Sequence, residues 1–282
     1  MIDAHQHFWD PAQFDYPWME AAEMAPLRRR FGPGDLAPLL AANGVDATIV
    51  VQCCSSIEET EAFLAIAETT PFVAGVVGWV DLSDPAIDAT LTHLASRPKL
   101  VGIRHQVHDE DDPRWLPRPD VRRGLEAVFR HGLAYDLLVR TRELGPAIEM
   151  IRDAPQGHFI LNHAAKPTLS SGITEAWRAG IAALAEQPNV WCKLSGLLTE
   201  ADWRGWTAAQ LMPAVRHVWN SFGANRVIFG SDWPVCLLAS NYAEVKRVAA
   251  TCLRSVGAED GSQVWGANAI EAYRLNVGEM GC

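Results

Sequence analysis

Eight short apolar segments recur along the chain, and their number and spacing constrain the fold more than any other feature. Several are near-continuous hydrophobic runs, as expected of parallel strands that are buried on both faces. Segments with helical spacing separate them, so strand and helix alternate in the pattern of right-handed βαβ units. The predicted strands span 2–8, 47–53, 73–82, 101–107, 134–140, 158–164, 190–196 and 226–234.

Eight such units predict a closed barrel. A (β/α)8 barrel takes about 250 residues, and the chain has 282. A doubly wound open sheet is the competing architecture, but no glycine-rich phosphate loop follows the first strand, where that fold would carry it. We therefore predict an α/β protein with one (β/α)8 TIM barrel domain over residues 1–282. Its first βα loop, from Trp9 to about Val45, is unusually long, which is typical of a functional cover or of a segment with some structure of its own.

The acidic composition excludes nucleic acid as a partner. The formal net charge is −10, so no basic stripe is available to neutralise phosphates. No apolar stretch approaches the roughly 20 residues of a membrane span, and the N-terminus lacks the regions of a signal peptide. We expect no membrane partner, and a homo-oligomer is compatible with the sequence.

The cysteines indicate a reducing compartment. They have no CxxC spacing and lie mainly in apolar runs, so we expect buried thiols of a cytoplasmic protein rather than a disulfide framework. They occupy positions 53, 54, 192, 236, 252 and 282.

Polar side chains gather at the carboxyl ends of the predicted strands, where barrel enzymes place catalytic groups. The first strand ends in a His-x-His pair, and period-two geometry points both imidazoles to the same side. A lone histidine at a strand end is more often structural, but a cluster of titratable groups on one rim favours a functional site. The residues at the eight ends are His5 and His7, Gln52, Trp79 and Asp81, Arg104 and His105, Arg140, Asn162 and His163, Lys193 and Ser195, and Ser231 and Asp232.

Two further patterns support a site at this rim. Lys193 lies in an otherwise apolar strand, and a buried lysine needs a carboxylate partner or a functional role. Tryptophans 9, 18, 79 and 233 lie beside the site positions, and their aromatic faces would suit the apolar side of a sugar-like ring.

Ordered motifs along almost the whole chain resemble the amidohydrolase superfamily. They are the His-x-His pair, "LNHAAKP", "CKLSGL", "FGSDWPV" and "VWGANAIEAYRL". The stretches "HQHFW", "GIRHQVHDE" and "GSDWPVCLLASNYAEV" are similar to its lactonase branch, which includes L-fuconolactonases and L-rhamnono-lactonases.

The resemblance implies hydrolysis of a sugar lactone, L-fuconolactone or a related aldonolactone, to its aldonic acid, with a place in L-fucose catabolism. His5, His7, His163 and Asp232 match the metal-site motif of the superfamily, although the fourth strand offers Arg-His where a bridging ligand would be sought. Members of the lactonase branch work without a required divalent metal. No cofactor is therefore required, while zinc could bind to His5, His7 and Asp232.

The chemistry of a lactone suggests roles for the site residues. We expect Asp232 to act as general base toward water and His163 to orient it. Oxyanion donors would come from His105, Arg104 and Lys193, or from protonated His5 or His7. The predicted substrate-binding residues are His5, His7, Gln52, Trp18, Trp79, Arg140 and Trp233.

Two alternatives remain open from the sequence. One is a zinc-dependent decarboxylase of the same superfamily, which would need a tightly bound metal. The other is a non-catalytic barrel that binds a sugar acid, although clustered titratable groups favour an enzyme.

Overall fold

A computed structural model describes residues 1–258 and 263–276, and its eight parallel strands follow one another around a barrel. A bridge between Gln6 and Trp233 joins β1 to the segment that follows β8, and the His7 amide donates to the Trp233 carbonyl at 2.7 Å. The predicted (β/α)8 TIM barrel is confirmed. The strands are β1 (Ile2–Gln6), β2 (Ala47–Val51), β3 (Val73–Gly78), β4 (Leu100–His105), β5 (Ala134–Leu137), β6 (Phe159–Leu161), β7 (Val190–Leu194) and β8 (Val227–Phe229).

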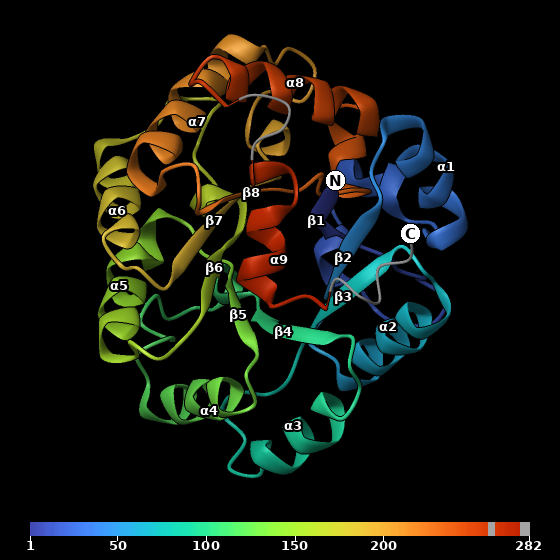
Figure 1. The fold of residues 1–282 in the computed structure, drawn as a ribbon, viewed down its shortest axis with the longest axis vertical. Helices are drawn as coiled ribbons and strands as arrows, with labels where there is room; N and C mark the ends of the chain where they lie inside the picture. The colour runs from blue at the N-terminus through green and yellow to red at the C-terminus, as the bar shows by residue number, and fades with distance from the viewer. Residues whose placement is uncertain (259–262, 277–282) are drawn as a thin grey trace.

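The helices form an outer layer around these strands. Figure 1 shows α1 to α8 arranged around the barrel and α9 lying across one of its ends. The helices are α1 (Pro33–Asn43), α2 (Ile57–Thr69), α3 (Ile87–Ala95), α4 (Pro119–Arg130), α5 (Leu144–Asp153), α6 (Glu175–Ala185), α7 (Ala208–Phe222), α8 (Tyr242–Arg254) and α9 (Ala267–Tyr273).

Two details differ from the sequence prediction. The strands end earlier than the apolar runs do, most clearly in β6 and β8, because the chain turns out of the sheet where the polar residues begin. The long first connection contains α1, which the sequence pattern does not reveal because Pro33 and Pro38 lie within it. Pro33 occupies the first helical position, where proline is tolerated.

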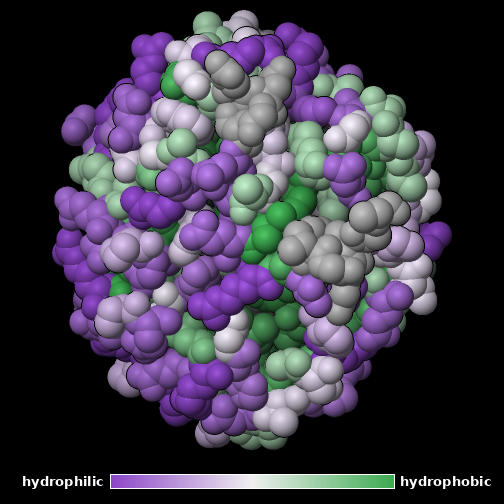
Figure 2. All heavy atoms as spheres, viewed as in Figure 1, coloured by the Kyte–Doolittle hydropathy of each residue, from purple (hydrophilic) through white to green (hydrophobic). Residues whose placement is uncertain are grey.

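The helix α9 closes the amino end of the barrel. Its buried side chains join the strand residues that fill the barrel interior, such as Ile49 and Ile160. The Tyr273 hydroxyl lies 2.7 and 2.9 Å from the two carboxylate oxygens of Asp136 in β5. Figure 2 shows this face mostly covered by hydrophilic residues, with hydrophobic residues visible in strips between them. A small-molecule site must therefore open at the opposite, carboxyl end.

A buried carboxylate fastens β1 to the segment after β8. Asp3 accepts hydrogen bonds from the Ser231 amide at 2.8 Å and from the Tyr242 hydroxyl at 2.9 Å. The residues that follow these two strands are thereby held side by side at the carboxyl end.

The cysteines in the described ranges are free thiols, as expected. None of the helices in those ranges combines the length and apolarity that crossing a bilayer requires. Cys53, Cys192, Cys236 and Cys252 are buried, Cys54 is partly buried, and Cys282 lies outside the described residues.

A close approach between α4 and the chain after β3 gives a test of the packing. A methyl group added at Gly124 would lie 2.1 Å from the Leu82 carbonyl oxygen, whereas one added at Gly145 in α5 would have no atom within 4 Å. Gly-to-Ala replacement inside a helix usually stabilises by about 1 kcal/mol. We expect Gly145→Ala to raise the free energy of unfolding, and Gly124→Ala to lower it by about 1–3 kcal/mol through overpacking.

Urea denaturation of both variants measures the two effects. A Gly124→Ala protein as stable as Gly145→Ala would contradict the packing described between α4 and the β3–α3 connection.

Candidate active site

A cavity of about 580 Å³, including its opening to solvent, lies at the carboxyl ends of the strands. The residues that line it are His7, Trp18, Cys53, Arg104, Gln106, His108, Asp109, Leu138, His163, Lys166, Asp232 and Val235.

One carboxylate oxygen lies among three imidazole rings at this cavity. Asp232 Oδ1 is 3.3 Å from His7 Nε2, 3.7 Å from His5 Nε2 and 3.9 Å from His163 Nε2. All four residues are buried. Because they follow or belong to β1, β6 and β8, it is the closure of the barrel that brings them together.

The backbone turns that carry Asp232 and His163 are unusual. Their φ angles are 58° and 52°, in the left-handed region, and the run after β6 continues to Lys166 at 49°. Residues other than glycine are uncommon in this region, and such conformations concentrate at functional sites. The turn after β6 thus places both His163 and Lys166 on the cavity wall.

The hydrogen bonds of His7 fix the direction of its lone pair. Its Nδ1 lies 2.7 Å from the Val51 carbonyl oxygen, which can only accept, so Nδ1 carries the proton. The lone pair of Nε2 then points toward Asp232 Oδ1. A proton that enters between these two atoms is shared by both as a hydrogen bond. His7 and Asp232 therefore form a pair that can hold one transferable proton.

Burial sets the charge states of this cluster. It lowers the pKa of His5, His7 and His163 below the usual value, and the charge of Lys193 lowers that of His5 further. Burial opposes ionisation of Asp232, but the interactions with His163 and His7 outweigh it, so the pKa of Asp232 lies below its usual value. A carboxylate beside neutral imidazoles suits the removal of a proton from water.

Arg104 brings a buried positive charge to the same cavity. Its Nε donates to Gln52 Oε1 at 2.9 Å, its Nη1 lies 3.3 Å from His5 Nε2 and 3.2 Å from Asn162 Oδ1, and its Nη2 donates to the Gln52 carbonyl. Guanidinium has five N–H groups, two of them on each Nη atom, and the contact with the Gln52 carbonyl engages one of those on Nη2. The remaining N–H on Nη2 is available to a bound ligand.

Lys193 lies beneath His5 and does not line the cavity. Its Nζ is 2.7 Å from Asp136 Oδ2 and 3.2 Å from His5 Nδ1, and neither Lys193 nor Asp136 has exposed side-chain surface. The carboxylate partner that a buried lysine needs is thus Asp136. Lys193 can influence chemistry only through His5.

His5, His7 and Asp232 are close enough to share a metal ion, with candidate ligand atoms within 4.8 Å of one another. A histidine that binds metal through one nitrogen normally donates its other N–H to an acceptor. His7 meets this condition through Val51. His5 does not, because its Nδ1 faces the Lys193 ammonium group. The residues therefore fit a divalent metal only in part.

Several predicted site residues lie outside the cavity lining. His105 has both ring nitrogens engaged, with Trp79 Nε1 at 3.0 Å and Glu110 Oε1 at 2.7 Å. Arg140 pairs with Glu200 at 3.3 Å, which in turn binds Lys166, so it supports the cavity wall. The ring of Trp233 is buried edge-on against other aromatic side chains.

The long first loop contributes to the cavity, as its length suggested. Its first 3₁₀ turn, Pro17–Met19, carries Trp18, whose Nε1 donates to the Cys53 carbonyl at 3.1 Å. Trp18 lines the cavity together with Cys53 itself. An aromatic wall thus comes from the segment between β1 and α1.

Four polar residues of the cavity lining are not among those predicted from the sequence: Gln106, His108, Asp109 and Lys166. His108 follows β4 in a 3₁₀ turn, and its Nδ1 is buried without a hydrogen-bond partner. Lys166 Nζ lies 2.9 Å from Glu200 Oε1. Their positions within five residues of a strand end are a signal that could have identified them.

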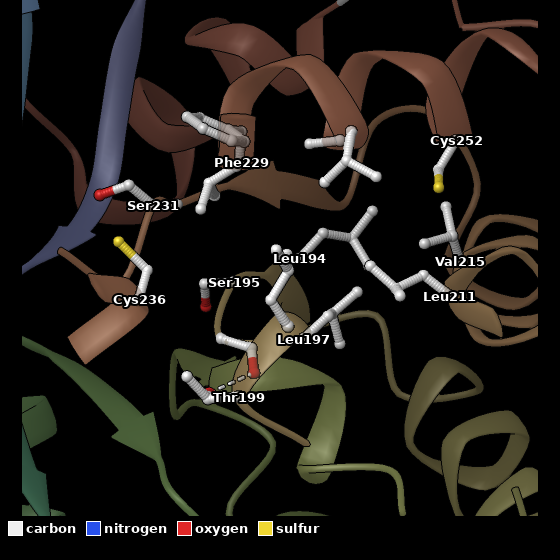
Figure 3. A pocket seen from close by; sticks show the side chains of 16 residues that line it. Leu194, Ser195, Leu197, Thr199, Leu211, Val215, Phe229, Ser231, Cys236 and Cys252 are labelled. Atoms are coloured by element: carbon white, nitrogen blue, oxygen red, sulfur yellow. Dashed lines mark hydrogen bonds between the residues drawn. The ribbon is translucent and has the colours of Figure 1, made fainter. Parts of the chain in front are cut away.

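A second cavity lies behind the barrel wall and has a different character. Figure 3 shows Leu194 of β7, Phe229 of β8, Leu211 and Val215 of α7 and Cys252 of α8 around it. None of the described residues that line this cavity has a charged side chain, so it is space between the strand and helix layers rather than a place for chemistry.

Comparison with known proteins agrees with this arrangement. A family model described as amidohydrolase matches residues 2–275. An L-fucono-1,5-lactonase from Burkholderia ambifaria is 42% identical over 98% of this chain and 96% of its own length. Another, from Burkholderia multivorans, is 39% identical over 97% of this chain and 96% of its own length.

The chain belongs to the amidohydrolase family. A solved amidohydrolase from Burkholderia multivorans, described with bound zinc, is 37% identical and superposes with a TM-score of 0.90 over 98% of this chain and 99% of that chain. The family resemblance seen in the sequence is therefore confirmed.

A glycine of this amidohydrolase allows the approach of His163 to Asp232. Gly196 has a φ of 61°, and a methyl group there would lie 2.6 Å from His163 Nδ1 and 3.0 Å from Asp232 Oδ2. We expect Gly196→Ala to reduce turnover on the order of 10²-fold, the effect of a misplaced catalytic group.

Gly44 provides a matched control, because its φ is 62° and an added methyl group would contact nothing within 4 Å. Both variants carry the same left-handed backbone strain, which costs about 1–2 kcal/mol, and Gly196→Ala adds the close contact of its methyl group with His163. Turnover assays and thermal unfolding separate the two effects. An active Gly196→Ala protein would contradict the described site.

Proposed function

We propose that this amidohydrolase opens a sugar lactone, L-fucono-1,5-lactone or a close stereoisomer, to the hydroxy acid. The observation that carries the proposal is the buried Asp232 carboxylate, which shares one cavity with the His7 and His163 imidazoles and with a free Arg104 N–H. The likeness to the two Burkholderia lactonases supports it.

The first step is attack of water on the lactone carbonyl carbon. Asp232 accepts the proton of the water as it attacks, and the His7–Asp232 pair then holds that proton. His163, anchored through Nδ1 to Ser195 Oγ at 2.9 Å, orients the carboxylate and the water. General-base assistance of this kind contributes about 10²- to 10⁴-fold.

The attack places negative charge on the former carbonyl oxygen. Arg104 stabilises it with the Nη2 N–H that no group of residues 1–258 and 263–276 accepts, and Lys166 adds a second cation on the cavity wall. These residues take the role that the sequence assigned to Arg104 with His105 and Lys193. A single such donor is worth roughly 3 kcal/mol.

Collapse of the tetrahedral intermediate breaks the bond between the carbonyl carbon and the ring oxygen. The departing alkoxide needs a proton, which the His7–Asp232 pair returns. The product is the open hydroxy acid, and the site regains its carboxylate.

Binding of the sugar falls to the cavity walls. Trp18 offers an aromatic face, and the unpaired Nδ1 of His108 is available to a hydroxyl group. His5 and Gln52 lie deeper and position Arg104 rather than the substrate.

We propose further that the reaction requires no divalent metal and takes place in the cytoplasm as a step of L-fucose catabolism. A zinc ion, if bound, would supply a Lewis acid for the carbonyl, but Arg104 already provides positive charge at this place. Free thiols are compatible with a reducing compartment.

Asp232→Asn tests the assignment of the base. Asparagine tolerates the left-handed backbone at this position but cannot accept the proton. We expect turnover of L-fucono-1,5-lactone to fall about 10²- to 10⁴-fold while the unfolding temperature stays close to that of the wild type. A pH-indicator assay of acid release over a panel of sugar lactones measures it.

Asp81→Asn is the control, because Asp81 is exposed and its carboxylate accepts from the amide and the hydroxyl of Ser83 in the loop after β3. It should leave turnover unchanged. An Asp232→Asn enzyme with nearly full activity would refute the mechanism, and a wild-type protein that opens no sugar lactone would refute the proposed function.

A further inference from the structure

The two histidines of the His-x-His pair have opposite surroundings. His7 Nδ1 faces the carbonyl oxygen of Val51 at 2.7 Å. His5 Nδ1 instead faces the ammonium group of Lys193 at 3.2 Å, and its Nε2 faces the guanidinium group of Arg104 at 3.3 Å. Only one of the two histidines therefore has the environment of a metal ligand.

Lys193 is held in this position from several sides. Asp136 accepts hydrogen bonds from Lys193 Nζ at 2.7 Å, from Asn162 Nδ2 at 2.8 Å and from the Tyr273 hydroxyl. The last of these comes from α9 at the amino end of the barrel. With its acceptors occupied, Asp136 fixes the ammonium group and leaves an N–H for His5.

This arrangement opposes a metal ion at His5. A ligating His5 would use the lone pair of Nε2 and point its Nδ1–H at Lys193, which has no lone pair to accept it. Lys193 has no exposed surface and Arg104 is 4% exposed, so water screens neither charge. A divalent cation bound at His5 Nε2 would be repelled by the positive charges of both Lys193 and Arg104.

We propose that Lys193, pinned by Asp136, and Arg104 suppress divalent metal binding at the His5–His7–Asp232 group, with Lys193 acting as a positioning residue that fixes His5. The pair thus makes this amidohydrolase site a metal-poor one whose positive charge comes from the chain itself. The inference concerns metal affinity and does not depend on which lactone is opened; only the catalytic use of Arg104 rests on the proposed function.

The test is zinc affinity, measured on the full chain by competition with a chromophoric chelator. Replacement of Lys193 by methionine removes the cation and keeps the apolar stem. We expect Lys193→Met to bind zinc about 10- to 100-fold more tightly than the wild type, the usual scale for a residue that contacts a metal ligand.

Two further variants keep the test decisive. Lys193→Met alone leaves the buried Asp136 carboxylate without its cation, which could prevent folding. Asp136→Asn combined with Lys193→Met removes both charges of this pair and so avoids that problem. Lys246→Met controls for the overall loss of a cation, because Lys246 lies far from the site and bonds the Asn43 carbonyl; it should leave zinc affinity unchanged.

Replacement of His5 tests whether its imidazole is the ligand that zinc gains when Lys193 is removed. His5→Asn should abolish the gained affinity in the Lys193→Met background and change little in the wild type. Cobalt substitution gives a second readout, since the visible spectrum of bound Co²⁺ should change between wild type and Lys193→Met only if His5 joins the coordination sphere.

The outcomes separate this inference from the proposed function. Wild-type zinc affinity in both Lys193 variants would overturn it, as would a wild-type protein whose tight zinc binding is lost on His5→Asn. Absence of lactone hydrolysis would overturn the proposed function and leave these affinity comparisons valid.

Discussion

The contact of Asp232 with three imidazoles is the interaction on which the site depends. Its Oδ1 atom lies within 3.9 Å of the Nε2 atoms of His5, His7 and His163. This contact therefore joins residues that belong to or follow β1, β6 and β8. Buried carboxylates normally resist ionisation, yet here the neighbouring rings keep the pKa of Asp232 low. A negative charge can therefore persist on this buried carboxylate, and Arg104 and Lys193 balance it from the other side of His5.

The barrel supplies this geometry through long-range constraints. Asp3 ties the first strand to the segment after the last one, and α9 sends Tyr273 to Asp136 beneath the site. The chain of contacts from Tyr273 through Asp136 and Lys193 to His5 links the closed end of the barrel to the open one. The same buried polar contacts stabilise the fold and position His5. A substitution at the amino end of the barrel can therefore alter the site.

The sequence predicts the barrel and the residues that follow directly on strands, because apolar runs and strand ends are local features. His7, Arg104, His163 and Asp232 are identified in this way and line one cavity. The burial and direction of a side chain depend on the whole fold rather than on neighbouring residues in the sequence. The sequence therefore does not show that Lys193 lies under His5 or that His105 turns toward Trp79 and Glu110. Lys166 reaches the cavity wall through a run of left-handed residues, and the sequence shows only that it lies near the end of a strand.

In the proposed mechanism the Asp232 carboxylate and the cations of Arg104 and Lys166, rather than a metal ion, open the lactone. The most direct test measures turnover of L-fucono-1,5-lactone and bound zinc in the same samples, from chelator-treated to zinc-saturated protein. The account predicts full turnover in the zinc-free samples, with no gain as zinc is added. Turnover that vanishes without zinc and rises in proportion to bound zinc would contradict it.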